Sequence, residues 1–274
     1  MSTSAPTALL SIDFDGTLVD SQRSNPILEE LTETLKSLRS QNVSWVVNTG
    51  RTVTHTIEGF VYHQLSLLPD YLIAREREVY VRNNFNRWID LGDWNRQCAK
   101  AHVKLFRKSK KTIRAVREFV SQSTNARFIE STDEPCGIIA SDLAEMDTIC
   151  SFIETIKPAD GDLHYERNSV YLRFSHRHFT KGSSLQFLAQ TIGIPSSSVF
   201  AIGDGFNDLT KLRRDIAEMI ACPSNAVMEV KSHVIDNGGY VASSSEGEGV
   251  VEALCHFAAL GLLPKISLCN QTSA

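Results

Sequence analysis

Two short apolar segments from opposite ends of the chain each run directly into a group of aspartates. Residues 8–14 lead into the stretch Asp13–Leu18, and Val199–Ile202 leads into the stretch Gly203–Asp208. Short apolar runs bounded by turn residues are typical of buried strands, and open α/β sheets bind ligands at the carboxyl ends of their strands. The repeated arrangement therefore predicts a parallel sheet in which two strands end in carboxylates.

The segments around these strands alternate between helix and strand patterns. Residues 26–40 have apolar side chains at helical spacing and precede an apolar strand at Val43–Asn48, which with the first strand predicts a βαβ unit. Residues 92–175 differ, because they read as helices combined with paired strands. We therefore expect an α/β core formed by residues 1–91 and 176–274, split by an inserted α+β domain at residues 92–175.

The charge balance disfavours nucleic acid as a partner. The 274 residues include 28 Lys and Arg against 32 Asp and Glu, which gives a formal net charge of −4 and no overall attraction to a polyanion. One basic run lies on a predicted helix at residues 100–117, and such runs are mostly solvated faces. The alternatives are that this run attracts a small phosphorylated or carboxylated substrate or, ranked well below that, RNA.

Neither a membrane span nor a targeting segment is expected. The longest apolar run near the C-terminus, Phe257–Leu263, is far shorter than the roughly 20 residues needed to cross a bilayer. The first ten residues contain no Lys or Arg, which a secretory or transit sequence would carry. We therefore expect a cytoplasmic protein with no membrane partner.

The aspartates have the spacing of a site for a hard divalent cation. Asp13 and Asp15 would share a face if the strand continued, and Gly16 allows the backbone to turn so that both converge on one ligand. Asp204 and Asp208 lie where a loop is predicted to become a helix. Oxygen ligands of this kind suit Mg²⁺, whereas zinc would require His or Cys. The alternative is that Asp15 only forms a turn and Asp13 only caps the strand.

Two further elements supply groups that bind phosphate. Thr49, Gly50 and Arg51 follow the second predicted strand, and Lys181 opens the helix that precedes the strand at residues 199–202. A hydroxyl, backbone amides and cationic side chains are suited to holding a phosphoryl group. Taken alone, Thr49 is more often a capping residue and Lys181 more often a surface charge, but four motifs in this order favour a phosphate site.

With these motifs the chain resembles the haloacid dehalogenase superfamily of phosphohydrolases, within it the Cof-like and sucrose-phosphatase-like group with an inserted cap of type IIB. The resemblance implies a Rossmann-like, doubly wound parallel core with an α+β cap between the second and third motifs. It also implies roles for the matched residues: Asp13 as nucleophile, Asp15 as general acid and base, Thr49 and Lys181 as catalytic phosphate ligands, Gly50, Arg51 and Asn207 as further phosphate-site residues, and Asp13, the Asp15 carbonyl, Asp204 and Asp208 as Mg²⁺ ligands.

The implied activity is Mg²⁺-dependent hydrolysis of a small phosphate monoester, with a sugar phosphate as the expected class. A carboxylate nucleophile divides the reaction into phosphoryl transfer to Asp13 and hydrolysis of the resulting aspartyl-phosphate, while Asp15 first donates and then accepts a proton. Two rivals stay open. One is a phosphomutase of the same fold, similar to phosphomannomutase, and the other is a non-catalytic sugar-phosphate-binding module, against which the presence of every motif residue argues. The oligomeric state is left open.

Selectivity for the substrate is expected to come from the cap. Its predicted strands at residues 163–167 and 170–174 carry four polar or aromatic side chains, Tyr165, Arg167, Tyr171 and Arg173. These four either form one face suited to a sugar or simply cover one side of an antiparallel sheet.

Two segments depart from the pattern of the family. Arg75–Glu78 follows the third predicted strand, and Ala221–Ala226 follows the predicted metal motif, where relatives often have an Asn-Gly pair and a small Gly-rich loop. Both are expected near the rim of the site, so they weaken any transfer of substrate identity. The charged segment Arg75–Glu78 would equally fit an exposed turn.

Overall fold

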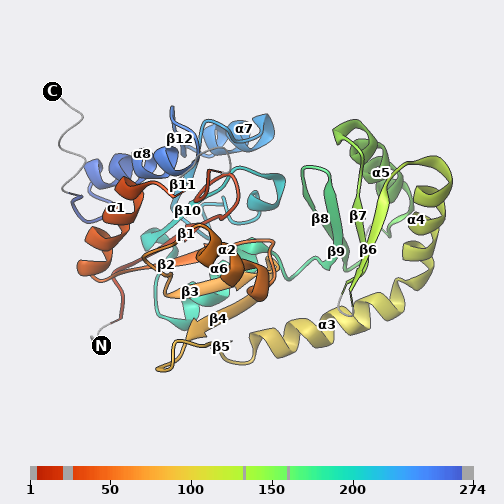
Figure 1. Cartoon of the computed structure of the whole chain (residues 1–274), viewed down its shortest axis with the longest axis horizontal. Helices are drawn as coiled ribbons and strands as arrows, with labels where there is room; N and C mark the ends of the chain where they lie inside the picture. The colour runs from red at the N-terminus through yellow and green to blue at the C-terminus, as the bar shows by residue number, and fades with distance from the viewer. Residues whose placement is uncertain (1–4, 21–26, 132–133, 159–160, 267–274) are drawn as a thin grey trace. The chain divides into compact units, whose positions relative to one another are not determined.

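The computed structural model describes residues 5–20, 27–131, 134–158 and 161–266. The chain divides into two compact units, a core made of Met1–Trp94 and Lys181–Ala274 and a cap made of Asn95–Thr180 (Figure 1). The sequence suggested residues 92 and 175 as the limits of the insert. Trp94 belongs to the core because its ring stacks on Phe187, with ring centroids 4.6 Å apart, and its indole N–H donates to the carbonyl of Arg77 at 2.7 Å.

The core contains one eight-stranded sheet in the order β12-β11-β10-β1-β2-β3-β4-β5. Neighbouring strands are parallel from β12 to β3, and β4 and β5 add an antiparallel hairpin at one edge. The strands are β1 (Ala8–Ile12), β2 (Val43–Asn48), β3 (Tyr71–Ala74), β4 (Glu78–Arg82), β5 (Trp88–Asp90), β10 (Val199–Ile202), β11 (Met219–Cys222) and β12 (Tyr240–Val241).

Helices cover both faces of this sheet, which confirms the predicted doubly wound fold (Figure 1). On one face, α1 (Glu29–Ser40) and α8 (Glu246–Ala259) bury apolar side chains at helical spacing, such as Leu31, Leu35 and Leu254. On the other face, α6 (Lys181–Thr191) and α7 (Met228–Asp236) do the same with Leu188 and Val234. The remaining core helices are α2 (Val53–Tyr62) and the short 3₁₀ helices η1 (Ser196–Ser198) and η2 (Phe206–Asp208).

The chain changes direction across the sheet between β1 and β10. From β1 it proceeds through β2 to β3 on one side, and from β10 it proceeds through β11 to β12 on the other. Ile12 lies in register with Ile202, and the backbone N–H of Asp13 donates to the carbonyl of Ile202 at 3.2 Å. Such a switch point leaves a crevice at the carboxyl ends of the strands, and the predicted acidic motifs meet there.

The cap is an antiparallel sheet packed against helices. Its four strands have the order β6-β7-β9-β8. They are β6 (Arg127–Ser131), β7 (Glu134–Ile139), β8 (Leu163–Asn168) and β9 (Tyr171–His176), and the helices are α3 (Trp94–Lys108), α4 (Lys110–Ser123) and α5 (Leu143–Ile156). Val116, Ile149 and Phe174 are members of one apolar core shared by α4, α5 and the sheet. Among the described residues, no helix of either unit is both long enough and apolar enough to span a membrane.

Two predicted helices differ from the structure. The basic helix expected at residues 100–117 is interrupted at Ser109, where α3 ends and α4 begins. The helix predicted to begin near Asp208 does not form, and the 3₁₀ helix η2 is followed there by turns. In the second case, Asp208 uses its carboxylate in contacts with buried lysines, described below, which hold a compact turn in place of a regular helix.

The four cap residues expected on one face lie on two faces. Tyr165 and Arg167 are in register with Phe174 and Leu172, so they share a face with those residues, whereas Tyr171 and Arg173 alternate to the opposite face. The face of Tyr165 and Arg167 lies against α5, because Arg167 pairs with Asp147 of that helix. The prediction of a single face was wrong, since it ignored the register between the two strands.

Candidate active site

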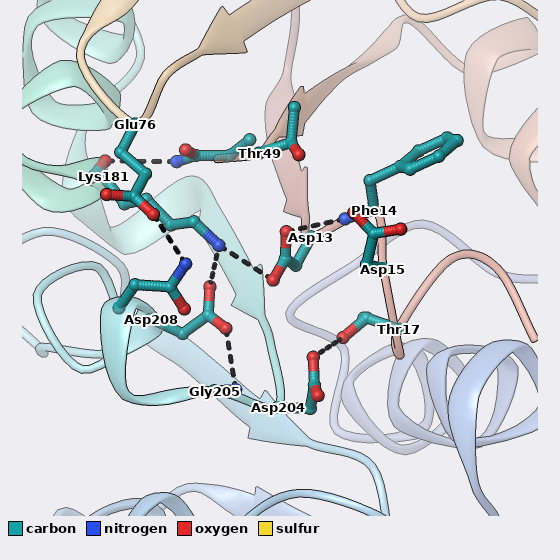
Figure 2. Close-up of polar contacts among 12 residues, drawn as sticks. Asp13, Phe14, Asp15, Thr17, Thr49, Glu76, Lys181, Asp204, Gly205 and Asp208 are labelled. Atoms are coloured by element: carbon teal, nitrogen blue, oxygen red, sulfur yellow. Dashed lines mark hydrogen bonds and ion pairs between the residues drawn. The ribbon is translucent and has the colours of Figure 1, made fainter. Parts of the chain in front are cut away.

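A buried lysine joins the two acidic motifs. Lys181, at the start of α6, has its Nζ atom 2.8 Å from Oδ2 of Asp13 and 2.8 Å from Oδ1 of Asp208, and its side chain is fully buried (Figure 2). Asn48 at the end of β2 donates to the backbone carbonyl of Lys181 at 3.1 Å, which fixes the start of the helix. The interpretation of Lys181 as a surface charge is therefore excluded.

A second buried lysine contacts the same carboxylate. The Nζ atom of Lys211 is 2.8 Å from Oδ1 of Asp208, and both side chains have no exposed surface. The other oxygen of Asp208 accepts a hydrogen bond from the backbone N–H of Gly205 at 3.0 Å. Lys211 was not predicted as a site residue, although its position three residues after Asp208 was the available signal.

Asp204 lies close to the first motif. Its Oδ1 accepts a hydrogen bond from the hydroxyl of Thr17 at 2.9 Å. Gly16 has a positive φ of 70°, and a Cβ there would lie 2.6 Å from Oδ2 of Asp204. The glycine is therefore required both by the backbone turn and by the close approach of this carboxylate.

Burial and charge shift the pKa values of these groups in different directions. Burial and the Asp208 carboxylate raise the pKa of Asp13 well above its usual range, and the same two causes raise that of Asp204 to about 6. Burial opposes the charge on Lys181, but Asp13 and Asp208 more than reverse this effect and raise its pKa. For Asp208, the two lysines outweigh burial and lower the pKa.

The donor set fits a hard divalent cation. One carboxylate oxygen each from Asp13, Asp204 and Asp208 can be chosen so that all lie within 4.8 Å of one another. When ionised, these three acids and Glu76, which is buried nearby, carry four negative charges. Lys181 and Lys211 offset two of them, which leaves an excess of two negative charges. One divalent cation would balance that excess, and oxygen ligands are those that Mg²⁺ prefers.

The phosphate-binding segment predicted after β2 lies beside the acids and is held by backbone bonds. Thr49 is buried, and its backbone N–H donates to the carbonyl of Ile73 at 2.8 Å. Its hydroxyl accepts a hydrogen bond from the backbone N–H of Arg51 at 3.1 Å, so the residue also makes the local capping bond considered for it. In the chain, Gly50 follows Thr49 directly and precedes Arg51.

Arg51 forms a two-point ion pair with Asp15. The Nε atom of Arg51 is 2.8 Å from Oδ2 of Asp15, and its Nη2 atom is 2.5 Å from Oδ1 of Asp15. The guanidinium also lies over the ring of Phe14, 4.8 Å from the ring centroid. The side chain of Asp15 thus points away from the three clustered carboxylates, and Figure 2 shows it on the other side of the strand end from Lys181.

A cavity of about 620 Å³ opens beside the carboxylate of Asp15. It lies within the core and is lined by Asp15, Gly16, Val19, Arg51, His55, Glu58, Gly59, Tyr62 and His63. The polar side chains from α2 and the residue after it were not predicted as site residues. Their only signal in the sequence was that they follow the phosphate-binding segment.

The segment that departs from the family pattern is part of the site. Glu76 and Arg77 are each only 3% exposed, so the interpretation of Arg75–Glu78 as an exposed turn was wrong. Oε1 of Glu76 accepts a hydrogen bond from Nδ2 of Asn207 at 2.7 Å, and a Cβ at Gly50 would lie 3.1 Å from the same oxygen. Asn207, expected as a phosphate-site residue, therefore links the loop of Asp204 and Asp208 to the end of β3.

The second segment that departs from the family pattern, Ala221–Ala226, contacts the turn after Asp15. Nδ2 of Asn225 donates to the carbonyl of Gly16 at 2.8 Å, and its Oδ1 accepts a hydrogen bond from the backbone N–H of Glu246 at 2.8 Å. Ala221–Ala226 thus fastens the turn after Asp15 to the start of α8.

Comparison with known proteins decides the family. The chain matches the family model of haloacid dehalogenase-like hydrolases over residues 10–74 and 61–254. The chain belongs to this family. The predicted resemblance is therefore confirmed, and the prediction of a phosphoric monoester hydrolase is confirmed at the level of the family and of its named relatives.

Among curated proteins, the relatives that match are phosphatases. A phosphoglycolate phosphatase of Methanothermobacter thermautotrophicus is 32% identical over 106 residues, a match that spans only 38% of this chain and 45% of that protein. A phosphoglycolate phosphatase of Methanobrevibacter smithii is 25% identical over 261 residues, which cover 90% of this chain and 97% of that protein.

Among solved structures, the sucrose-phosphatase of Synechocystis, in complex with sucrose and phosphate, has a TM-score of 0.71 at 19% identity. The alignment covers 92% of this chain and 98% of that one. A subclass IIB sugar phosphatase aligns over 94% of this chain with a TM-score of 0.64 at 16% identity. These likenesses establish a shared fold.

Proposed function

We propose that this protein is a Mg²⁺-dependent phosphatase that hydrolyses a small phosphate monoester, with a sugar phosphate as substrate, through an aspartyl-phosphate on Asp13. The observation that carries the proposal is the position of Lys181, whose ammonium group bridges Asp13 and Asp208 next to Asp204. A nucleophile, a buried cation and an acidic metal site at one strand end are the parts that phosphoryl transfer requires.

Asp13 is the nucleophile in this proposal. Its Oδ1 is held by the backbone N–H of Phe14 at 2.7 Å, which leaves Oδ2, beside Lys181, to attack phosphorus. The bond from phosphorus to the leaving oxygen breaks as the bond to Oδ2 forms, and water then hydrolyses the acyl phosphate. Lys181 would stabilise the negative charge on the transferred group, with Thr49, Gly50 and Arg51 as its further ligands.

Asp15 is the general acid and base. It would donate a proton to the leaving alcohol and later take one from the attacking water. In the structure its carboxylate is occupied by Arg51. A phosphate that enters the site would compete with Asp15 for the guanidinium, and release of Asp15 would free it for proton transfer.

Asp13, the carbonyl of Asp15, Asp204 and Asp208 would hold Mg²⁺. The bound cation would supply Lewis-acid stabilisation of the phosphoryl oxygens. Asp208 makes more protein contacts than the other two carboxylates, because its Oδ1 pairs with both Lys181 and Lys211 and its Oδ2 accepts a hydrogen bond from Gly205. We infer that it mainly positions Lys181, with its remaining lone pairs directed to the metal.

The leaving group would occupy the cavity beside Asp15. Its volume of about 620 Å³ lies in the range of sites for small molecules. His55, Glu58 and Tyr62 contribute hydrogen-bonding groups that suit the hydroxyls of a sugar. The names of the relatives supply a second substrate to test, phosphoglycolate.

The test is release of inorganic phosphate from sugar phosphates, nucleotides and phosphoglycolate, with Mg²⁺ and with a chelator. Asp13→Asn should abolish release, whereas Asp215→Asn, which alters an exposed carboxylate, should not. Release that persists in Asp13→Asn would refute the assigned nucleophile. Absence of release with all substrates, but isomerised product in the presence of a sugar bisphosphate, would identify the phosphomutase instead.

A further inference from the structure

A hollow of about 540 Å³ lies at the bend between α3 and α4 of the cap. It is lined by Val103, Phe106, Arg107, Lys110, Ile113, Arg114 and Arg117, all of which belong to the cap unit. The bend exists because the basic helix is interrupted at Ser109, so side chains that would lie along one straight helix instead surround a depression. The proposed phosphatase chemistry uses none of these residues.

The floor of this hollow is apolar. Ile113 is buried in the cap core, and Phe106 packs against that core while remaining partly exposed. Val103 is apolar but 72% exposed, although α3 has many polar residues that could occupy an exposed position instead. An apolar surface of this kind gains free energy when a ligand removes it from water.

The walls of the hollow are cationic. Arg107 lies near the end of α3, and Lys110, Arg114 and Arg117 follow on α4 at spacings of four and three residues, at which like charges on one helix repel. None of the described residues that line the hollow is acidic. Arg114 pairs with Glu118 at 2.9 Å, and Arg107 and Lys110 have no ion pair among the residues that the structure describes.

We propose that this hollow binds a small organic anion that has an apolar body and one sulfonate, carboxylate or phosphate group. The apolar part would cover Val103 and Phe106, and the anionic group would lie between Arg107 and Lys110. A small molecule is favoured because the volume is within the range of ligand pockets, whereas a protein partner would need about 800 Å² of surface on this side. RNA is disfavoured because, of the lining residues within the described part of the chain, only Phe106 is aromatic. The proposal does not depend on the function of the core.

The experiment is a fluorescence titration of the full chain with anilinonaphthalene sulfonate, an amphipathic anion, compared with N-phenylnaphthylamine, its uncharged analogue. The sulfonate should bind saturably at one site per chain, about tenfold more tightly than the uncharged probe, and added salt should weaken it. Equal affinity for both probes, or no saturable binding, would overturn the proposal.

Two matched double variants locate the site. Arg107→Gln with Lys110→Gln removes two cations from the hollow and should weaken binding of the sulfonate about tenfold. Lys104→Gln with Lys111→Gln removes two exposed cations from the same helices but outside the hollow, and should change the affinity less than about twofold. Similar losses in both pairs would show that only general positive charge is sensed and would refute the site. Val103→Ser, at an exposed position that folding does not require, should also weaken the sulfonate.

Discussion

Replacing Glu76 by alanine tests whether the turn after β3 holds the loop of Asp204 and Asp208 in place. Glu76 is 3% exposed, and its carboxylate accepts the hydrogen bond of Asn207, in the segment between Asp204 and Asp208. Its removal leaves a buried amide N–H without this acceptor. We expect both a less stable core and slower phosphoryl transfer, because Asn207 no longer fixes the loop that carries the two aspartates.

The magnitude follows from the contact that is lost. A hydrogen bond to a charged group contributes about 1.5–3 kcal/mol, and a buried donor without a partner costs a similar amount. We therefore expect Glu76→Ala to destabilise the core by about 2–3 kcal/mol, a fall in Tm of about 5–10 °C. If loss of this hydrogen bond destabilises the transition state by a similar free energy, kcat/KM should fall about 10- to 100-fold.

Two further variants separate the causes. Glu76→Gln can still accept from Asn207 and should retain most of the stability, so any loss of kcat would report the missing charge near Lys181. Glu76 has a positive φ of 64°, which costs a residue with a side chain about 1 kcal/mol. Glu76→Gly removes that cost along with the carboxylate, so it should be about 1 kcal/mol more stable than Glu76→Ala while being equally slow.

Thermal unfolding and kcat/KM are measured on all three variants, with the pH profile of kcat as the readout of chemistry. A positioning role predicts a lower kcat with an unchanged profile. If Glu76→Ala unfolded at the temperature of the wild type and kept its kcat/KM within about twofold, the hydrogen bond to Asn207 would have no such role.

Three other perturbations have defined outcomes. Gly16→Ala should fold but lose most phosphatase activity, measured as phosphate release, because its Cβ would displace Asp204 and its φ is positive; unchanged activity would contradict the assigned approach. Mg²⁺ should raise the Tm of the wild type and not that of Asp204→Asn, which calorimetry checks without any substrate; an equal rise in both would place the cation elsewhere. Burial opposes ionisation of Glu252, but hydrogen bonds from Ser243, Tyr240 and Ser244 lower its pKa from 4.5 to about 2. The ionised carboxylate therefore stabilises the fold above pH 4.5, and this stabilisation is lost as the pH falls toward 2. After allowance for solvent screening, Glu252→Gln should cost about 1 kcal/mol at pH 6 and almost nothing near pH 2.5, a difference that acid unfolding curves would reveal or refute.

The core fold could be predicted from the sequence because its signals are local. Apolar runs at residues 8–14 and 199–202 and the helical spacing of Leu31, Leu35 and Leu38 depend only on nearby residues. The break at Ser109 could not be predicted in this way, because neither Gly nor Pro marks it. The two faces of the cap strands also escaped prediction, since they depend on the register of β8 against β9.

The same contrast applies within the site. Asp13 and Asp204 each follow an apolar strand, and the carboxyl ends of parallel strands lie at the same edge of a sheet. Their proximity could therefore be predicted from the sequence. Lys211 lies in turns where a helix was expected. Its side chain can be buried because Asp208 pairs with it in the tertiary structure, whereas an unpaired buried ammonium group would cost too much free energy.

Glu76 shows why a departure from a family pattern can hide a functional contact. Arg75 and Glu76 have consecutive positive φ values of 49° and 64°, a conformation that glycine adopts easily and that a charged residue adopts only where other contacts compensate. The backbone N–H groups of both residues bond back to the segment after β2, to the carbonyls of Arg51 and Thr49 at 2.8 and 2.9 Å. The left-handed turn therefore directs the Glu76 carboxylate inward to Asn207 rather than to solvent. A glycine at this position would satisfy the backbone but could not hold the loop of Asp204 and Asp208, so we infer that the strain is retained for the contact that the side chain makes.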